Sequence, residues 1–149
     1  MENPKYLFES TASFTTYEFV SEGPKGRIRK LVSYAEFGDT GAYNLGFGDK
    51  LGDTDNFDDK VITDNGDSKK VLATVAATLY EFINKHPNAL VFATGSTVAR
   101  TRLYRIGISN ALDDINKDFV VRGYFEGEWE IFERNRDYSI FLITKKIRT

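Results

Sequence analysis

The sequence predicts an α+β fold, built as a single mixed, largely antiparallel sheet with two main helices. Residues 6–47 are rich in Phe, Tyr, Val and Thr and are punctuated by glycine turns, which is typical of strands. Residues 68–85 carry apolar side chains every three or four positions, as in an amphipathic helix, and residues 89–94 form an apolar run typical of a buried strand. The expected order is β-β-β-(β)-α-β-α-β-β.

The elements of the first half follow from local signals. Residues 6–47 should supply three or four antiparallel strands, and a long polar loop should follow from Gly46 to Asp67, broken by a short run at residues 60–63. The first helix begins at Ser68 with Asp67 or Ser68 as its cap, and it ends before the sequence HPN at residues 86–88.

The second half is expected to alternate strand, helix and two strands. The second helix begins at Ser96 or Thr97 and runs to about Ile115. The last strands lie at residues 119–132, with an interruption around Gly127, and at residues 138–146.

Composition limits the class of protein. A chain of 149 residues with 41% hydrophobic and 14% aromatic residues predicts one folded domain, residues 1–149. A net charge of -2 argues against a globally basic nucleic-acid binder. The absence of cysteine and the single His86 exclude disulfides, thiolate zinc sites and histidine-rich metal sites, and no metal or cofactor is expected. Without a membrane-length apolar run or a signal core, the protein is predicted to be cytoplasmic, with no membrane partner.

The segment GSTVARTRLYR, residues 95–105, is the strongest candidate for a site. On a helical wheel one broad face is apolar, and it comprises Leu103, Tyr104, Gly107, Ile108, Ala111 and Ile115. Arg102 and Arg105 fall on the opposite side, whereas Arg100 lies over Gly107 among residues that should be buried. A buried guanidinium needs a carboxylate, backbone carbonyls or a bound anion.

An anion site is therefore predicted at the start of the second helix. Backbone N–H groups at a strand-to-helix turn carry the positive end of the helix dipole and bind phosphate or carboxylate. The predicted ligand-binding residues are Gly95, Ser96, Thr97, Arg100, Arg102, Tyr104 and Arg105. In the competing interpretation Ser96 or Thr97 merely caps the helix, and Arg100 pairs with an internal carboxylate of Glu36, Glu126 or Asp49.

Other polar and aromatic groups have functional and structural interpretations. Arg102 and Arg105 could extend a basic strip for nucleic-acid phosphates that includes Lys145, Lys146 and Arg148, or could form a solvated helix face. The strand aromatics could stack on bases, although packing is the more common role; they are Tyr124, Phe125, Trp129 and Phe132. The loop aspartates could bind a hard cation, but their spacing departs from an EF-hand and favours a solvated acidic loop; they are Asp53, Asp55, Asp58 and Asp59.

Two resemblances add to these observations. Residues 65–76 (NGDSKKVLATVA), the EF and HP pairs that follow, and GSTVARTRLYR resemble a family of small bacterial proteins known only as a domain of unknown function. The element order resembles the second half of GNAT-type acetyltransferases. Those enzymes hold the coenzyme A pyrophosphate at a glycine-rich, arginine-containing turn, whereas this chain has DNGD at residues 64–67, where two aspartates would repel that ligand.

The function is not determined by the sequence. The preferred interpretation is a binding module for a phosphate-bearing ligand, either a nucleotide or nucleic acid, or for a protein partner, with self-association through sheet edges as one form. The alternative is an enzyme with a GNAT-like half-fold acting on an acyl or phosphorylated substrate, with Arg100 holding the anion and Tyr104 or an acidic-loop carboxylate handling a proton. No catalytic residue is identified.

Overall fold

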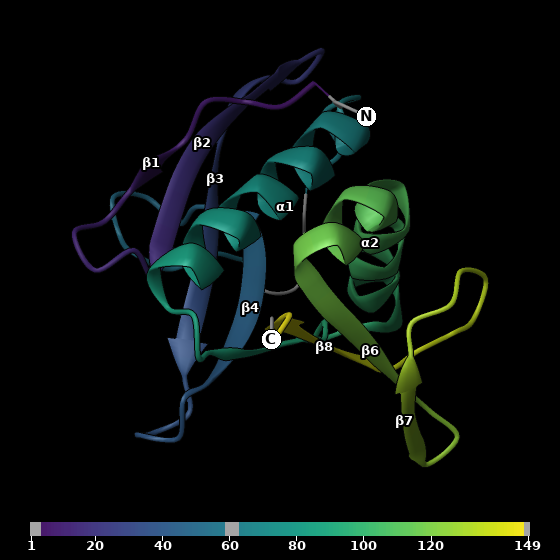
Figure 1. The fold of residues 1–149 in the computed structure, drawn as a ribbon. Helices are drawn as coiled ribbons and strands as arrows, with labels where there is room; N and C mark the ends of the chain where they lie inside the picture. Colours follow the sequence, from purple (N-terminus) through teal and green to yellow (C-terminus); the bar gives the residue numbers. More distant parts are fainter. Residues whose placement is uncertain (1–3, 59–62, 148–149) are drawn as a thin grey trace.

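The described part of the protein consists of two helices and an eight-stranded sheet (Figure 1). The computed structural model describes residues 4–58 and 63–147. In chain order the elements are β1 (Glu9–Ser10), β2 (Thr16–Gly23), β3 (Gly26–Glu36), β4 (Ala42–Asp49), α1 (Ser68–Lys85), β5 (Leu90–Ala93), α2 (Val98–Asp118), β6 (Phe119–Phe125), β7 (Glu128–Ile131) and β8 (Ile140–Lys145). The α+β prediction is confirmed.

The strands lie in the order β1-β2-β3-β4-β5-β8-β6-β7. Neighbours pair antiparallel except β4 and β5, which are parallel and are joined through α1. The parallel register runs from Ala42 opposite Leu90 to Leu45 opposite Ala93 and ends there. Beyond Leu45, β4 continues to Asp49 without β5 beside it, so the β5 side of β4 needs other hydrogen-bond partners in this stretch.

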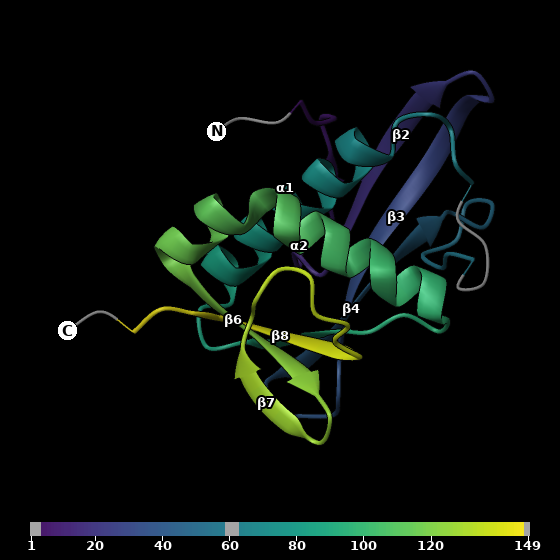
Figure 2. The same cartoon turned by 90° about the vertical axis from the view of Figure 1, so that its right-hand side faces the viewer.

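Both helices pack on one side of the sheet (Figure 2). The predicted bounds of α1 are confirmed at both ends, and its buried side chains recur at helical spacing: Val71, Leu72, Thr74, Val75, Thr78, Leu79, Phe82 and Ile83. The buried residues of α2 are Arg100, Tyr104, Ile108, Leu112 and Ile115. Gly107 faces α1, because a Cβ there would lie 3.5 Å from Leu72.

The polar segment after β4 folds back onto the sheet. The predicted loop from Gly46 is wrong at its start, because β4 extends through Asp49, and Lys50 and Phe57 form an isolated antiparallel bridge. The Phe57 ring covers Gly46 and Gly48 so closely that a Cβ on either glycine would lie under 3 Å from it. These glycines are therefore needed for close approach. Most of the predicted run at residues 60–63 lies outside the described residues.

Neither described helix is long and apolar enough to cross a membrane.

Candidate functional site

The turn between β5 and α2 is held by its own backbone and hydroxyl groups. Thr97 is the N-cap residue in extended geometry, and its side chain accepts a hydrogen bond from the Arg100 amide at 3.2 Å. The Gly95 amide donates to the Thr101 hydroxyl at 2.9 Å, and a Cβ on Gly95 would lie 2.5 Å from the Thr101 nitrogen. The predicted capping by Thr97 is confirmed, and the turn requires glycine at position 95.

An open groove of about 760 Å³ runs along this turn; we call it the α2 groove. Its walls come from the β5–α2 turn, the exposed side of α2 and the segment before β8: Thr94, Gly95, Ser96, Thr97, Val98, Thr101, Arg102, Arg105, Asp137, Tyr138 and Ser139. The segment before β8 was not predicted to take part. Nothing in the sequence links residues 137–139 to GSTVARTRLYR, because only the insertion of β8 beside β5 brings them together.

Two guanidinium groups line the α2 groove. Arg105 forms an ion pair with Asp137, whose side chain is 89% exposed. Arg102 is exposed and forms no hydrogen bond or ion pair with any described residue. The groove therefore holds two cations and one carboxylate beside the positive end of the helix dipole, an arrangement that favours an anion.

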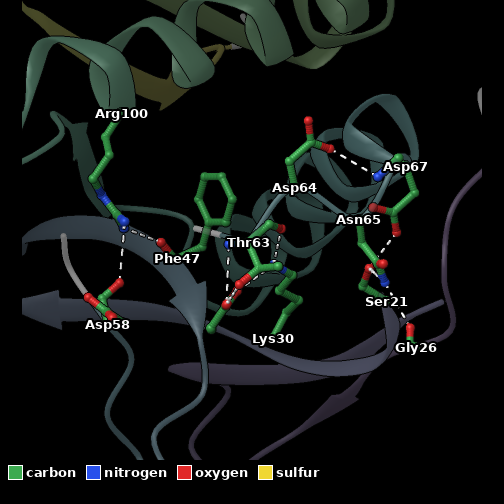
Figure 3. A network of polar contacts seen from close by, with 12 residues as sticks. Ser21, Gly26, Lys30, Phe47, Asp58, Thr63, Asp64, Asn65, Asp67 and Arg100 are labelled. Carbon is green, nitrogen blue, oxygen red and sulfur yellow. Dashed lines mark hydrogen bonds and ion pairs between the residues drawn. The ribbon is translucent and has the colours of Figure 1, made fainter. Parts of the chain in front are cut away.

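Arg100 does not line this groove. Its side chain points from the helix toward Phe47 and Asp58 (Figure 3). The residue is only 6% exposed, and its guanidinium donates hydrogen bonds to the backbone carbonyls of Phe47 and, at 3.3 Å, of Asp58. Its charged end also lies 5.8 Å from the centre of the Phe57 ring. The predicted burial is confirmed.

Of the partners considered for Arg100, the described part of the chain supplies backbone carbonyls and not the carboxylate of the competing interpretation. Asp49 instead binds Lys30, and Glu36 accepts from the Gly41 amide. Carbonyls replace carboxylates here because β5 ends opposite Leu45, which leaves the Phe47 carbonyl at an edge of β4 without a strand beside it.

Tyr104, one helical turn after Arg100, also donates a hydrogen bond to a backbone carbonyl of β4. Its hydroxyl donates to the Leu45 carbonyl at 3.2 Å, and the residue is 6% exposed. Burial raises the pKa of Tyr104 to about 12, from an ordinary 10.0. Tyr104 does not line the α2 groove, so the structure separates it and Arg100 from the other predicted binding residues.

A second polar network surrounds the start of α1 (Figure 3). The Lys30 ammonium is buried and binds the Asp49 carboxylate at 2.5 Å and the Thr63 carbonyl at 3.1 Å. Beside it lies a cavity of about 260 Å³, lined by Lys30, Phe47, Thr63, Asp64, Asp67, Ser68, Val71, Leu72 and Leu103. A buried ammonium needs an oppositely charged partner, and Asp49 is that partner for Lys30.

The turn before α1 is tied to the β2–β3 hairpin. The buried Asn65 amide donates to the Gly26 carbonyl at 2.8 Å and the Ser21 hydroxyl at 3.2 Å, and its oxygen accepts from the Lys25 amide at 2.7 Å. Asp67 accepts from Ser21 and Tyr6, at 2.6 and 2.5 Å. The prediction that the Asp67 side chain caps α1 is wrong, because Ser21 and Tyr6 donate to that carboxylate and no side-chain cap bond forms.

The remaining candidates are dispersed. Among the described residues no group of three acidic or histidine side chains could hold a metal ion, and Asp59 lies outside that part of the chain. Lys145 and Lys146 are exposed and do not line the α2 groove, and Arg148 is not described. Of the strand aromatics, Phe132 is buried, whereas Trp129 is 42% exposed.

Comparison with known proteins identifies the family. The model of a family of unknown function matches residues 2–146, nearly the whole chain. The chain belongs to DUF6934. No curated protein and no solved structure matches it, so the topological likeness to acetyltransferases is not supported. In this DUF6934 chain the two segments that carried the family resemblance lie at the starts of α1 and α2.

Proposed function

We propose that this chain is a bacterial cytoplasmic binding module that recognises a phosphate-bearing ligand, a nucleotide or the phosphates of a nucleic acid, in the α2 groove. The observation that carries the proposal is the position of Arg102 and Arg105 beside the open start of α2. The groove volume of about 760 Å³ falls within the range of small-ligand sites, about 300–1,000 Å³.

The charges of the α2 groove favour an anion over a neutral ligand. Arg102 has no partner among the described residues, and the partner of Arg105 is the exposed Asp137, which water screens. A phosphate oxygen could replace Asp137 on Arg105 while Arg102 binds a second oxygen. Charged hydrogen bonds of this kind are shorter and stronger than neutral ones.

The role of Arg100 in the proposal changes accordingly. Its two carbonyl partners hold the guanidinium against β4, so Arg100 shapes the turn and is not a ligand contact. The enzymatic alternative has less support, because the buried Tyr104 hydroxyl donates to the Leu45 carbonyl and its raised pKa opposes proton transfer at neutral pH. At the start of α1, where an acetyltransferase would hold coenzyme A, Asp64 and Asp67 lie on the cavity wall.

Calorimetric titration with ATP, pyrophosphate and a single-stranded oligonucleotide tests this function. The double variant R102A/R105A should lose at least about tenfold in affinity, the loss expected when two charge-assisted contacts are removed. For an oligonucleotide, the slope of log affinity against log salt should also fall by about 1.4, for two phosphate contacts to a single strand.

A matched double variant separates a site from general electrostatics. K25A/R27A also removes two positive charges, but from the exposed end of the β2–β3 hairpin. Neither of these side chains lines the α2 groove. Equal losses in both double variants, or no binding of any probe to the unaltered chain at millimolar concentration, would contradict the proposal.

A further inference from the structure

The sheet presents an apolar face on the side away from the helices. On β5, β8 and β6 the buried residues alternate with residues that point to the other side, and the pairing of β6 with β7 places Trp129 and Ile131 on that side too. We call these the open face: Leu90, Phe92, Val120, Arg122, Tyr124, Trp129, Ile131, Ile140, Leu142 and Thr144. None of them lines the α2 groove.

The strand register aligns these side chains into rows. Phe92 lies opposite Leu142, which lies opposite Arg122, which lies opposite Ile131. In the adjacent row Tyr124 lies between Ile140 and Trp129. The ring centres of Tyr124 and Trp129 are 5.3 Å apart, and those of Phe92 and Trp129 are 6.1 Å apart. The rows therefore form one continuous apolar surface across four strands.

The open face is exposed at Leu90, Trp129 and Ile131 and half-buried elsewhere, whereas the corresponding part of the other half is covered. Phe57 folds over Gly46 and Gly48 of β4, and Leu31 on the same side of β3 is only 2% exposed. In contrast, Trp129 is 42% exposed and Ile131 is 60% exposed. An apolar surface of this kind on a soluble protein marks an interaction site.

Arg122 specifies the charge of the occupant. It lies between Leu142 and Ile131 in the row that begins at Phe92, and it is half-buried. It makes no hydrogen bond or ion pair within the described parts of the chain. It is the one charged residue of the open face, which holds no carboxylate. A partner that covers this face must supply an anionic group to Arg122, since an unpaired guanidinium is costly to bury.

The chain itself is a poor occupant. Stacking two open faces about a central two-fold axis would bring two Arg122 side chains together. Pairing two β7 edges with matching faces would place Glu130 opposite Glu130, or Glu128 opposite Glu130, and like charges in these positions are destabilising.

A polynucleotide also fits less well than a protein. Single-stranded nucleic acid needs a positive groove along its backbone, whereas the open face offers one cation and several aliphatic side chains, beside a hairpin that carries Glu126 and Glu128. Trp, Tyr and Arg within an apolar surface are instead the residue types that dominate protein interfaces.

We propose that the open face is the docking surface for a partner protein, which lays an amphipathic helix across β8 and β6 and pairs a carboxylate within its apolar stripe with Arg122. A helix about 10 Å wide covers two strands spaced about 4.8 Å apart. This site is independent of the α2 groove.

Trp129 provides the test, because it is the only tryptophan of the chain. The probes are two capped helical peptides without tryptophan, identical except for Glu or Lys at the centre of a leucine stripe. The Glu peptide should shift Trp129 emission to the blue and bind about tenfold more tightly than the Lys peptide. R122E should reverse this preference, whereas R122Q should bind both peptides alike.

Other outcomes would overturn the proposal. If the two peptides bind the unaltered chain equally, or if neither binds at millimolar concentration, the proposed partner helix with its carboxylate is rejected. A concentration-dependent dimer in sedimentation that W129S abolishes assigns the face to a second copy, and an oligonucleotide that shifts Trp129 emission while the Glu peptide does not assigns it to nucleic acid. Thermal unfolding of each variant near the unaltered midpoint shows that the face, and not the fold, was changed.

Discussion

The turns that precede α1 and α2 use their polar residues in opposite ways. Before α1, Asn65 and Asp67 direct their side chains to the β2–β3 hairpin, and neither caps the helix. Before α2, Thr97 caps its own helix, and the arginines that follow divide between the interior and the groove. A polar turn can therefore stabilise the fold or expose a binding surface, and its sequence alone does not distinguish the two roles.

The largest expected effect comes from removing the first turn's contact with the hairpin. Asn65→Ala leaves the Gly26 carbonyl and the Lys25 amide without their partner and opens a small cavity. The free energy of unfolding should fall by about 3 kcal/mol, the sum expected for buried unsatisfied groups and lost packing. Urea unfolding at neutral pH measures the change; a loss below about 1 kcal/mol would contradict the structural role.

Substitutions of the arginines on the two sides of α2 should change the free energy of unfolding by very different amounts. Arg100→Met removes the hydrogen bonds that its guanidinium donates to the Phe47 and Asp58 carbonyls, and should cost about 2 kcal/mol. Arg102→Met serves as the matched control and should change stability by less than about 0.5 kcal/mol, because Arg102 is exposed. Similar losses in the two variants, measured by urea unfolding, would remove the distinction between them.

Alkaline pH should weaken the anchoring of α2. The pKa of Tyr104 is raised from 10.0 to about 12, so its contribution to stability is fully present below pH 10 and is lost as pH rises through about 12. Between pH 8 and 11 the unaltered chain should lose about 1 kcal/mol more than Tyr104→Phe. Parallel stability curves for the two proteins over this range would show that Tyr104 does not titrate as described.

An effect of about the same size should come from the cap of the second turn. Thr97→Ala removes one hydrogen bond to the Arg100 amide and should cost about 1 kcal/mol. Thr97→Ser keeps the oxygen and should restore most of this stability. If Thr97→Ala costs as much as Asn65→Ala, the two turns contribute alike, and the contrast between them is lost.

Local signals predicted much of the fold. Helical periodicity located α1 from Ser68 to Lys85, and the apolar run at residues 89–94 located β5, because these patterns depend on burial of one face or of both. The burial of Arg100 also followed from its place on the helical wheel.

Long-range pairing limited the prediction of the site. The carbonyl partners of Arg100 depend on where β5 stops beside β4, and the wall of the α2 groove at residues 137–139 depends on β8 lying next to β5. Neither relation leaves a pattern in the local sequence. The open face could not be predicted for a related reason, because the sequence of a strand does not show which of its aromatic residues a helix covers.

The place of β8 also has a consequence for the synthesis of the protein. This strand is the last of the described elements in chain order, yet it lies between β5 and β6 and pairs with both. Until residues 140–145 have left the ribosome, β5 and β6 each present an unpaired edge, which is a template for aggregation. Deletion of residues 140–145 would remove an interior strand and leave the facing edges of β5 and β6 unpaired, so this segment should tolerate truncation poorly.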